Sequence, residues 1–591
     1  MPRKASGEIK TDRYIETQAN GTTYVYERSR KYDPDKKYNV NLGTKLLGIL
    51  KPGTTDYHDD DNITSTRPKR KVNPKVANAH KARTGMIDII KHISDISGIE
   101  RELEAALPGE EGIAQKLLTC AWFLFATDGD SMPKIRPWSR KYEGILPYRH
   151  GIITKDMYHD LYYELGSREE VKQSIFQSRA DSLGEEVILA LDSSTFEVES
   201  CQLSAGRKAV HKDKLVKKVY KIVNFYSLDE RRPVAFSLLP GNIPDCSSVG
   251  NALKQLKVLN LSNVEIISDN GYCNDNTIAL MLLEGQHFIT RIGADIKWIQ
   301  PLIARHRRTL EHGGGIVECD PLFSGIKATV KRSFSTDDGR TVEKSVNVFI
   351  YFSSVNKSKD DVYFRETFSR YRHTLLNGTA QCDERKAIES FSDKYMVIEH
   401  GSDGEIVSIS ENTKNYDAHM KYNGYLVLIA DRESDVSTAL RKFRKREYFE
   451  EDIKNYKGHT GGRKARVWDT DTLEGQILAQ FLALTMHESF ESRIKYLKDT
   501  LAKPNGDAKH DTSDTLKSEK QLYNWIFKHS LFDILHWFDA IATTEVKGQN
   551  EKVTWITETT HRDKLFLEKL GIILRSNIEE ESISEEEIDT A

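Results

Sequence analysis

Three carboxylates in this sequence are of the type and in the setting that hold divalent cations. Asp192 and Asp269 each follow directly on a short, largely apolar segment, VILAL and VEIIS. Glu450 lies within the charged segment 443–457, FRKREYFEEDIKNYK. Carboxylate oxygens without histidine or cysteine favour Mg²⁺, with Mn²⁺ as a substitute. Two such ions about 3.5 to 4 Å apart can activate a nucleophile and stabilise a leaving oxygen, which predicts metal-dependent cleavage of phosphodiester bonds.

Residues 443–457 predict a helix with its charged side chains on one face. At about 100° per residue, Arg446, Glu450 and Lys457 fall within about 40° of one another. A neighbouring apolar strip on the same helix can dock on a core and leave the charged face at a cleft. The alternative is a solvated helix held by ion pairs one turn apart, which is the usual role of an isolated charged helix.

The two aspartates end strands in a series of predicted strands and helices. Apolar segments predict strands at EVILALD, KKVYKIVNFYSL and RPVAFSLLPGN, a helix at 244–256, a strand at VEIISD, a helix at 276–283 and a strand at HFITRI. A strand that is buried on both faces delivers the residue after it to the edge of a sheet. A further strand, GYLVLIAD, ends in Asp431 and leads directly into the helix that carries Glu450. We expect Asp431 to cap that helix or to form an ion pair.

The spacing of four residues in the charged helix resembles a family signature. Phe443 is followed after two residues by Arg446, after three more by Glu450 and after six more by Lys457. This resembles the YREK signature of cut-and-paste insertion-sequence transposases of the DDE type, with phenylalanine in the tyrosine position. The tracts LDSSTFE, LLPGNIPD and ISDNGYCNDNTIALMLLEGQHFITRI resemble the first acidic strand, the GN-x-x-D segment and the second acidic strand of that family. Asn270 stands where the family commonly has arginine.

The resemblance implies an α/β fold with an RNase H-like catalytic core, which is a mixed five-stranded sheet with helices. In that fold the first and fourth strands lie side by side, so Asp192 and Asp269 meet at the carboxyl edge of the sheet. The resemblance also implies a β-rich insertion between the second and third acidic residues. The segment from Asp269 to Glu450 is too long for a single connection, which agrees with an insertion.

The resemblance assigns DNA contacts to side chains beside the three carboxylates. Arg446 and Lys457 are expected to hold phosphates next to the metal ions. Arg291 follows the fifth strand segment, and Phe443 lacks the tyrosine hydroxyl but keeps a ring that can pack. Trp298 is a candidate for stacking on an extruded base, and the alternative for it is a place in the core.

A basic segment precedes the helical part of the chain. Residues 67–83, RPKRKVNPKVANAHKAR, contain seven cations and no acid. Three of the cations, Lys69, Arg70 and Lys71, are consecutive. Such a segment fits either a solvated linker or an arm that follows a phosphate backbone, and the two interpretations are evenly balanced.

A DNA transposase is the function that the resemblance implies. Such an enzyme binds the terminal inverted repeats of an insertion sequence as double-stranded DNA, cleaves the element ends and transfers the 3′-hydroxyl ends into target DNA, by way of hairpin ends. Joining two ends implies a homodimer in a synaptic complex. Two alternatives stay open: an RNase H-like nuclease that cuts without joining, and a domesticated, inactive DNA-binding protein. The intact acidic triad argues against the second, and the insertion with its YREK-like helix argues against the first.

With 591 residues, the chain is long enough for two to four domains, each with a core of its own. Composition and periodicity divide it into a β-rich region (1–65), a basic arm (66–84), a helical domain (85–184), the first part of the RNase H-like core (185–291), a β-rich insertion domain (292–423), the second part of the core with the YREK-like helix (424–466), a helical region (467–578) and an acidic disordered tail (579–591). The helical domain fits recognition of DNA ends, and a purely structural role is equally compatible.

Composition limits the surfaces and surroundings of the protein. The charged fraction is 30%, yet the net charge is only −3, so a nucleic-acid surface must be a local patch. The six cysteines include no C-x-x-C pair, which favours reduced thiols. The sequence shows neither the apolar run of a signal peptide nor an apolar stretch of about 18 residues. We therefore expect a protein of the prokaryotic cytoplasm that associates with the nucleoid and not with a membrane.

Overall fold

The chain forms two compact units, which are described separately. The larger comprises Ala82–Ala542 and Thr557–Arg575, and the smaller comprises Met1–Lys81, Thr543–Ile556 and Ser576–Ala591. The computed structural model describes residues 9–19, 21–33, 37–64, 76–198, 200, 202–210, 216–379, 384–459, 464–465, 467–501, 514–548, 551–572 and 579–582. In this described part, no helix has both the length and the apolar character needed to cross a membrane.

The first residues of the chain form a four-stranded antiparallel sheet, as their alternating pattern predicts. Neighbours in the sequence are neighbours in this sheet, in the order β1 (Lys10–Thr17), β2 (Thr23–Asp33), β3 (Tyr38–Leu50) and β4 (Ile63–Thr64). Val25 of β2 is fully buried, whereas most of the other described residues of the sheet are partly or fully exposed.

A second sheet brings together segments from both ends of the sequence. Its order is β21 (Glu579–Ser582), β20 (Glu551–Ile556), β19 (Ala542–Gly548) and β5 (Val76–Arg83). The structure thus differs from the expected linker and from the expected disordered tail, because the second half of the basic segment and the start of the acidic tail are strands. Both depend on partners far away in the sequence, and strand formation depends strongly on such partners. Lys69, Arg70 and Lys71 lie outside the described residues.

The central sheet of the larger unit is built around β6, the strand that carries Asp192. Strands β8 and β9 extend it antiparallel on one side, and β10 and β11 extend it parallel on the other. The bounds are β6 (Ile188–Val198), β7 (Arg207–Val210), β8 (Val216–Ser227), β9 (Arg232–Pro240), β10 (Glu265–Ser268) and β11 (His287–Ile292). The predicted pairing of the first strand with the fourth is confirmed, because β6 and β10 are parallel neighbours.

The sheet is larger than predicted because strands of the expected insertion join it. Within the described residues it has eleven strands, since β14 pairs with β17, and β17 pairs with β11. The added strands are β12 (Ile316–Val317), β13 (Asp320–Ser335), β14 (Thr341–Phe352), β17 (Tyr425–Ala430) and the short β18 (Lys464–Ala465) on β6. Strands β13 and β14 of the expected β-rich insertion are therefore part of the central sheet.

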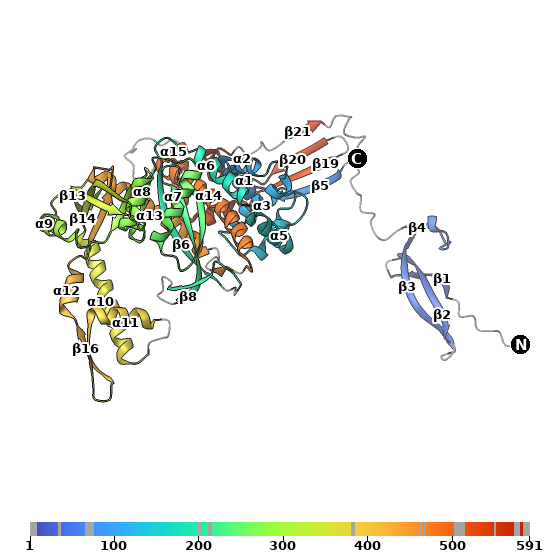
Figure 1. Cartoon of the computed structure of the whole chain (residues 1–591). Helices are drawn as coiled ribbons and strands as arrows, with labels where there is room; N and C mark the ends of the chain where they lie inside the picture. The colour runs from blue at the N-terminus through green and yellow to red at the C-terminus, as the bar shows by residue number, and fades with distance from the viewer. Residues whose placement is uncertain are drawn as a thin grey trace. The chain divides into compact units, whose positions relative to one another are not determined.

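The rest of the insertion is more helical than predicted. Strands β15 (Met396–His400) and β16 (Ile406–Glu411) form a hairpin, and four helices accompany them. These are α9 (Gln300–Glu311), α10 (Ser354–Leu376), α11 (Arg385–Tyr395) and α12 (Thr413–Met420). Figure 1 shows α10, α11, α12 and the hairpin as a group of yellow and orange elements. This group has a small apolar core of its own, which includes Tyr371, Ile388 and Met396.

Helices pack on the central sheet and share its apolar core. The predicted helical segment forms α1 (Gly85–Ser97), α2 (Ile99–Ala106), α3 (Glu111–Ala126), α4 (Ile135–Lys141), α5 (Lys155–Gly166) and α6 (Glu169–Asp181). The remaining helices are α7 (Asp245–Val258), α8 (Asp275–Leu283), α13 (Val436–His459), α14 (Thr470–Thr500), α15 (Asp514–Lys528), α16 (Leu531–Trp537) and α17 (His561–Leu570). Helix α14 contacts α1, α3, α5 and β9, so the N-terminal helices and the sheet form one continuous core.

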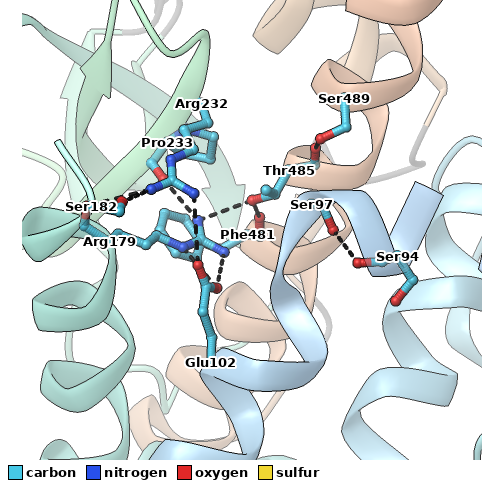
Figure 2. Close-up of polar contacts among 10 residues, drawn as sticks. All are labelled: Ser94, Ser97, Glu102, Arg179, Ser182, Arg232, Pro233, Phe481, Thr485 and Ser489. Atoms are coloured by element: carbon cyan, nitrogen blue, oxygen red, sulfur yellow. Dashed lines mark hydrogen bonds and ion pairs between the residues drawn. The ribbon is translucent and has the colours of Figure 1, made fainter. Parts of the chain in front are cut away.

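A buried arginine ties these layers together, as Figure 2 shows. Arg179 of α6 is completely buried and donates hydrogen bonds to Glu102 of α2 at 2.8 and 3.0 Å. It also donates to the carbonyl of Pro233 in β9 at 2.7 Å and to the hydroxyl of Thr485 in α14 at 2.9 Å. Its guanidinium lies 4.2 Å from the ring centre of Phe481. One side chain therefore joins four elements, and its buried charge is paired within the core.

Candidate active site

Two predicted carboxylates lie beside each other at the carboxyl edge formed by the end of β10. Asp269 follows the last residue of β10 as predicted, whereas the prediction that Asp192 ends its strand is wrong, because β6 continues to Val198. In the parallel pairing of β10 with β6, Ser268 is the partner of Leu191. Asp269 and Asp192 are the next residues along each strand, so they occupy the next level of the same register. Neighbouring strands are about 4.8 Å apart, which places the two side chains within reach of a shared cation. The structure thus brings together two residues that are far apart in the sequence.

Arg291 occupies the same level on the following strand. Thr290 of β11 is the partner of Ser268, so Arg291 follows beside Asp269. Its guanidinium nitrogen lies 3.8 Å from the Oδ1 atom of Asp269, and its side chain is 48% exposed. The Oδ1 atom itself is buried and accepts no hydrogen bond from any described residue. A carboxylate oxygen in that state is suited to a bound cation, because a buried acceptor without a partner is costly.

Helix α13 crosses the face of the sheet and leads toward these carboxylates. Near its start, Lys442 lies 2.7 Å from Glu265, the first residue of β10. One turn later, Arg446 lies over the ring of Phe443, which packs in one apolar cluster with Ile267 further along β10. A helix rises about 1.5 Å per residue, so Glu450 lies about 6 Å further in the same direction. The backbone of helix α13 therefore continues toward the edge of the sheet where Asp192 and Asp269 lie.

Phe443 lies in the core and not at the surface. Its ring is 3% exposed and belongs to an apolar cluster with Ala190 of β6 and Ile267 of β10. The guanidinium of Arg446, a residue that is 5% exposed, lies 5.0 Å from the centre of the Phe443 ring. The ring of Phe443 thus packs against the guanidinium of Arg446. The structure describes the backbone but not the side chains of residues 448–459, which include Glu450 and Lys457.

Asp245 is a nearby carboxylate to which the sequence analysis gave no role. It begins α7, and its Oδ1 atom accepts hydrogen bonds from Ser193 at 2.9 Å and from Lys221 at 2.8 Å. Lys221 also donates to the carbonyl of Ile243 at 2.8 Å. Because Ser193 directly follows Asp192, this network holds the strand next to the first carboxylate. The signal was present in the sequence, since Asp245 ends the LLPGNIPD tract.

Tyr272 is a buried polar residue three positions after Asp269. Burial, followed by the negative charges of Asp245 and Asp192, raises the pKa of its hydroxyl well above the usual value. The side chain is 2% exposed, and its hydroxyl makes no hydrogen bond with the described residues that meets normal geometry. The phenol therefore stays protonated at neutral pH. In the described part of the chain, no three histidine, cysteine, aspartate or glutamate side chains are arranged to hold a metal ion, and the side chain of Glu450 is outside that part.

Asp431 lies at the opposite edge of the sheet. It follows β17, which runs antiparallel to β11, and its side chain is 1% exposed. Its oxygens lie 2.8 Å from the Nδ1 atom of His287 and 3.0 Å from the backbone nitrogen of Phe288. The Nζ atom of Lys344 lies 3.9 Å from an Asp431 oxygen, in agreement with the expected ion-pair role. Asp431 is separated from Asp192 and Asp269 by the length of the strands.

Trp298 follows β11 from the carboxyl edge and is partly buried. The guanidinium of Arg332 lies 4.6 Å from the centre of its ring, and Arg332 also donates two hydrogen bonds to Asp275 at 2.8 and 3.0 Å. One face of the indole is thus covered within the protein. A base could stack on this ring only from the other side.

Comparison with known proteins agrees with this arrangement. The model of the family described as "Transposase DDE domain" matches residues 183–486, just over half of the chain. The match includes Asp192, Asp269 and Glu450, together with the strands and the helix that carry them. No curated protein matches the sequence at a significant level.

Proposed function

Since the chain belongs to the family of DDE transposases, we propose that it cuts DNA at the ends of an insertion sequence and joins those ends to target DNA. In this proposal the protein binds the terminal inverted repeats, cleaves by metal-dependent hydrolysis and transfers the 3′-hydroxyl ends, with hairpin ends as the intermediate. The observation that carries it is the shared level of Asp192 and Asp269 on adjacent parallel strands, with α13 directed toward them. The match of the family includes all of these elements.

The order of strands supports an RNase H-like core. Three antiparallel strands, β6, β8 and β9, are followed by α7, then β10 parallel to β6, then α8 and β11. We further propose that α13 is the YREK-type helix of a cut-and-paste transposase. Its residues Arg446 and Glu450 are one turn apart on the helix, and Phe443, which packs against Arg446, stands in the tyrosine position.

The residues at the carboxyl edge fit a pair of divalent cations. Asp192, Asp269 and Glu450 would hold two Mg²⁺ ions, with Mn²⁺ as a substitute, because their ligands are hard oxygens. When bound, such ions lower the pKa of an attacking water or hydroxyl and stabilise the leaving oxygen. The Oδ1 atom of Asp269 is buried and accepts no hydrogen bond from the described residues, which supports this assignment.

The remaining side chains have roles of their own. Arg291 is half exposed beside Asp269, where its guanidinium can hold a non-bridging oxygen of the scissile phosphate. Asp245, which is held by Lys221, accepts a hydrogen bond from Ser193 and so stabilises the part of the strand that carries Asp192. Arg446 is buried over Phe443 and is a positioning residue for the helix turn that carries Glu450. Lys457 lies two turns beyond Glu450 and is proposed to contact DNA.

An assay with element-end DNA tests the proposed function. The protein should nick or cut a duplex that carries the DNA flanking its own coding region, and the cut should need Mg²⁺ or Mn²⁺ and stop with a chelator. Pre-nicked ends should then be joined to a plasmid target by the same protein. Cutting without joining would favour a nuclease, and binding without cutting would favour an inactive DNA-binding protein. A protein dimer on two ends, measured by sedimentation, is the assembly that joining requires.

A further inference from the structure

A basic groove lies on the larger unit, apart from the carboxylates. It has a volume of about 950 Å³ and runs between α13, α14 and the segment before α16. Two glutamates line it, Glu488 and Glu491. The cations that line it are Arg231, Arg441, Arg444, Lys445, Lys495 and Lys498. We call this surface the cationic groove.

The cationic groove belongs to the opposite edge of the sheet from Asp192. Tyr226, one of its lining residues, pairs with Ala190 of β6, and the next lining residues follow the end of β8. These positions lie upstream of Asp192 along β6. Each residue of a strand adds about 3.3 Å, so Tyr226 lies about 7 Å and Leu228 about 13 Å from the level of Asp192 along the strands. It is therefore a separate surface and not an extension of the candidate active site.

Helix α13 has one face in the cationic groove and the opposite face against the central sheet. Counting about 100° per residue from Arg441, the groove residues Arg444 and Lys445 fall at about −60° and about +40°. Phe443 and Arg446 lie roughly opposite to them, at about 200° and about 140°, on the side that packs against the sheet. The same helix thus directs one set of charges to the carboxylates and another set to the groove.

Cations outnumber acids among the side chains that line the groove. Arg444 contacts Asp320, and Lys445 lies 2.9 Å from Asp229. The hydroxyl of Tyr226 donates to the buried Glu488 at 2.9 Å. The lining side chains comprise six cations and two glutamates, in a chain whose net charge is −3. Such a local excess attracts a polyanion that the protein as a whole does not attract.

The outer cations of the groove point to a phosphate backbone as the ligand. Arg441 and Lys495 are exposed, and Lys498 is partly exposed. The guanidinium of Arg441 donates to the neutral hydroxyl of Thr438 at 3.3 Å, and the ammonium of Lys498 lies 5.9 Å from the centre of the Phe527 ring. These heads are spread over two helices, as is suited to successive phosphates and not to one small anion.

We propose that the cationic groove binds the phosphate backbone of duplex DNA away from the phosphate that is cut. This inference rests on the proposed function, because it takes the ligand of the carboxylate edge to be DNA. It adds a second contact surface that anchors the duplex on the far side of α13. The contact is to phosphates and is therefore independent of base sequence and sensitive to salt.

The test measures how DNA affinity depends on salt in the full-length chain. The variant Arg441→Ala/Lys495→Ala/Lys498→Ala is compared with wild type by fluorescence anisotropy, on an arbitrary duplex of about 40 base pairs at about 50 to 300 mM KCl. The slope of log affinity against log salt should fall by about 2 to 3, since each phosphate that the variant no longer neutralises lowers it by about 0.9. A control with the same charge change on α10, Lys359→Ala/Arg365→Ala/Arg372→Ala, should keep the wild-type slope.

The outcomes separate this proposal from the proposed function. An unchanged slope in the groove variant overturns the groove, and an acidic protein partner as its ligand would give that result. Cleavage of element-end DNA by the groove variant should keep its kcat and show a raised KM, because the carboxylate edge is untouched. If wild type cuts no DNA but the slope difference holds, the proposed function fails and the groove stands. Should the triple variant unfold, the single variant Lys498→Gln should still lower the slope by about one.

Discussion

Replacing Asp192 by asparagine is expected to lower the rate of DNA cleavage about a thousandfold or more. The substitution keeps the shape of the side chain but removes one anionic ligand from the carboxylate edge, next to Asp269. Cation assistance in phosphodiester cleavage is worth several kcal/mol, and about 4 kcal/mol corresponds to about a thousandfold in rate. The measurement is single-turnover cleavage of labelled element-end DNA in Mg²⁺ and in Mn²⁺.

Two further variants calibrate this expectation. Asp245→Asn leaves the proposed ligands in place but weakens the hold on Ser193, so we expect a rate loss of only about 10- to 100-fold and a higher Mg²⁺ requirement. Asp393→Asn, on the exposed face of α11, should cleave at the wild-type rate. All three proteins should bind the duplex and unfold at similar temperatures. Cleavage by Asp192→Asn within about tenfold of wild type would remove Asp192 from the chemistry.

Replacing Arg179 by methionine is expected to destabilise the larger unit by about 3 to 5 kcal/mol. The variant leaves the buried Glu102 without its partner and also removes the donors to Pro233 and Thr485. Breaking one member of a buried ion pair costs more than the pair contributes, because the remaining charge stays out of water. The measurement is the free energy of the first unfolding transition in urea, followed by circular dichroism.

A second substitution should recover part of this stability. In Arg179→Met/Glu102→Leu both charges are gone, and apolar replacements of a buried pair are often close to neutral. We therefore expect the double variant to be more stable than Arg179→Met alone. Arg493→Met, at an exposed position of α14, should change the free energy of unfolding by less than about 0.5 kcal/mol. A cost below about 1 kcal/mol for Arg179→Met would show that the network in Figure 2 does not hold the helices on the sheet.

The sequence predicts those strands that depend on a local pattern of apolar residues. The segments before Asp192 and Asp269 are short, apolar and buried, and the strands β6 and β10 appear where such segments occur. The strands of the insertion were also predicted, but their membership in the central sheet was not. The link between β14 and β17 joins residues 347–352 to residues 425–430, and no local pattern records such a partner.

Other features of the fold were hidden for different physical reasons. Helix α10 buries few of its side chains, among them Phe364 and Tyr371, so it lacks the apolar stripe that predicts a helix. Strand β5 forms against β19, a partner from near the other end of the chain. In the site, the acidic residues could be chosen from the apolar segments that precede Asp192 and Asp269 and from the helix spacing, although β6 continues beyond Asp192. The contact of Lys221 with Asp245 could not, because it depends on how the end of β9 turns into α7.

The most direct test of the central claim asks whether Asp192, Asp269 and Glu450 share one cation site. Fe²⁺ is supplied in place of Mg²⁺ with ascorbate and hydrogen peroxide, so that radicals formed at the bound iron cut the polypeptide backbone nearby, and the fragments are mapped by mass spectrometry. The account predicts cuts beside all three residues, suppressed by excess Mg²⁺ and absent in Asp192→Asn. Cuts beside Asp192 and Asp269 without a cut near Glu450, or cuts only elsewhere, would contradict it.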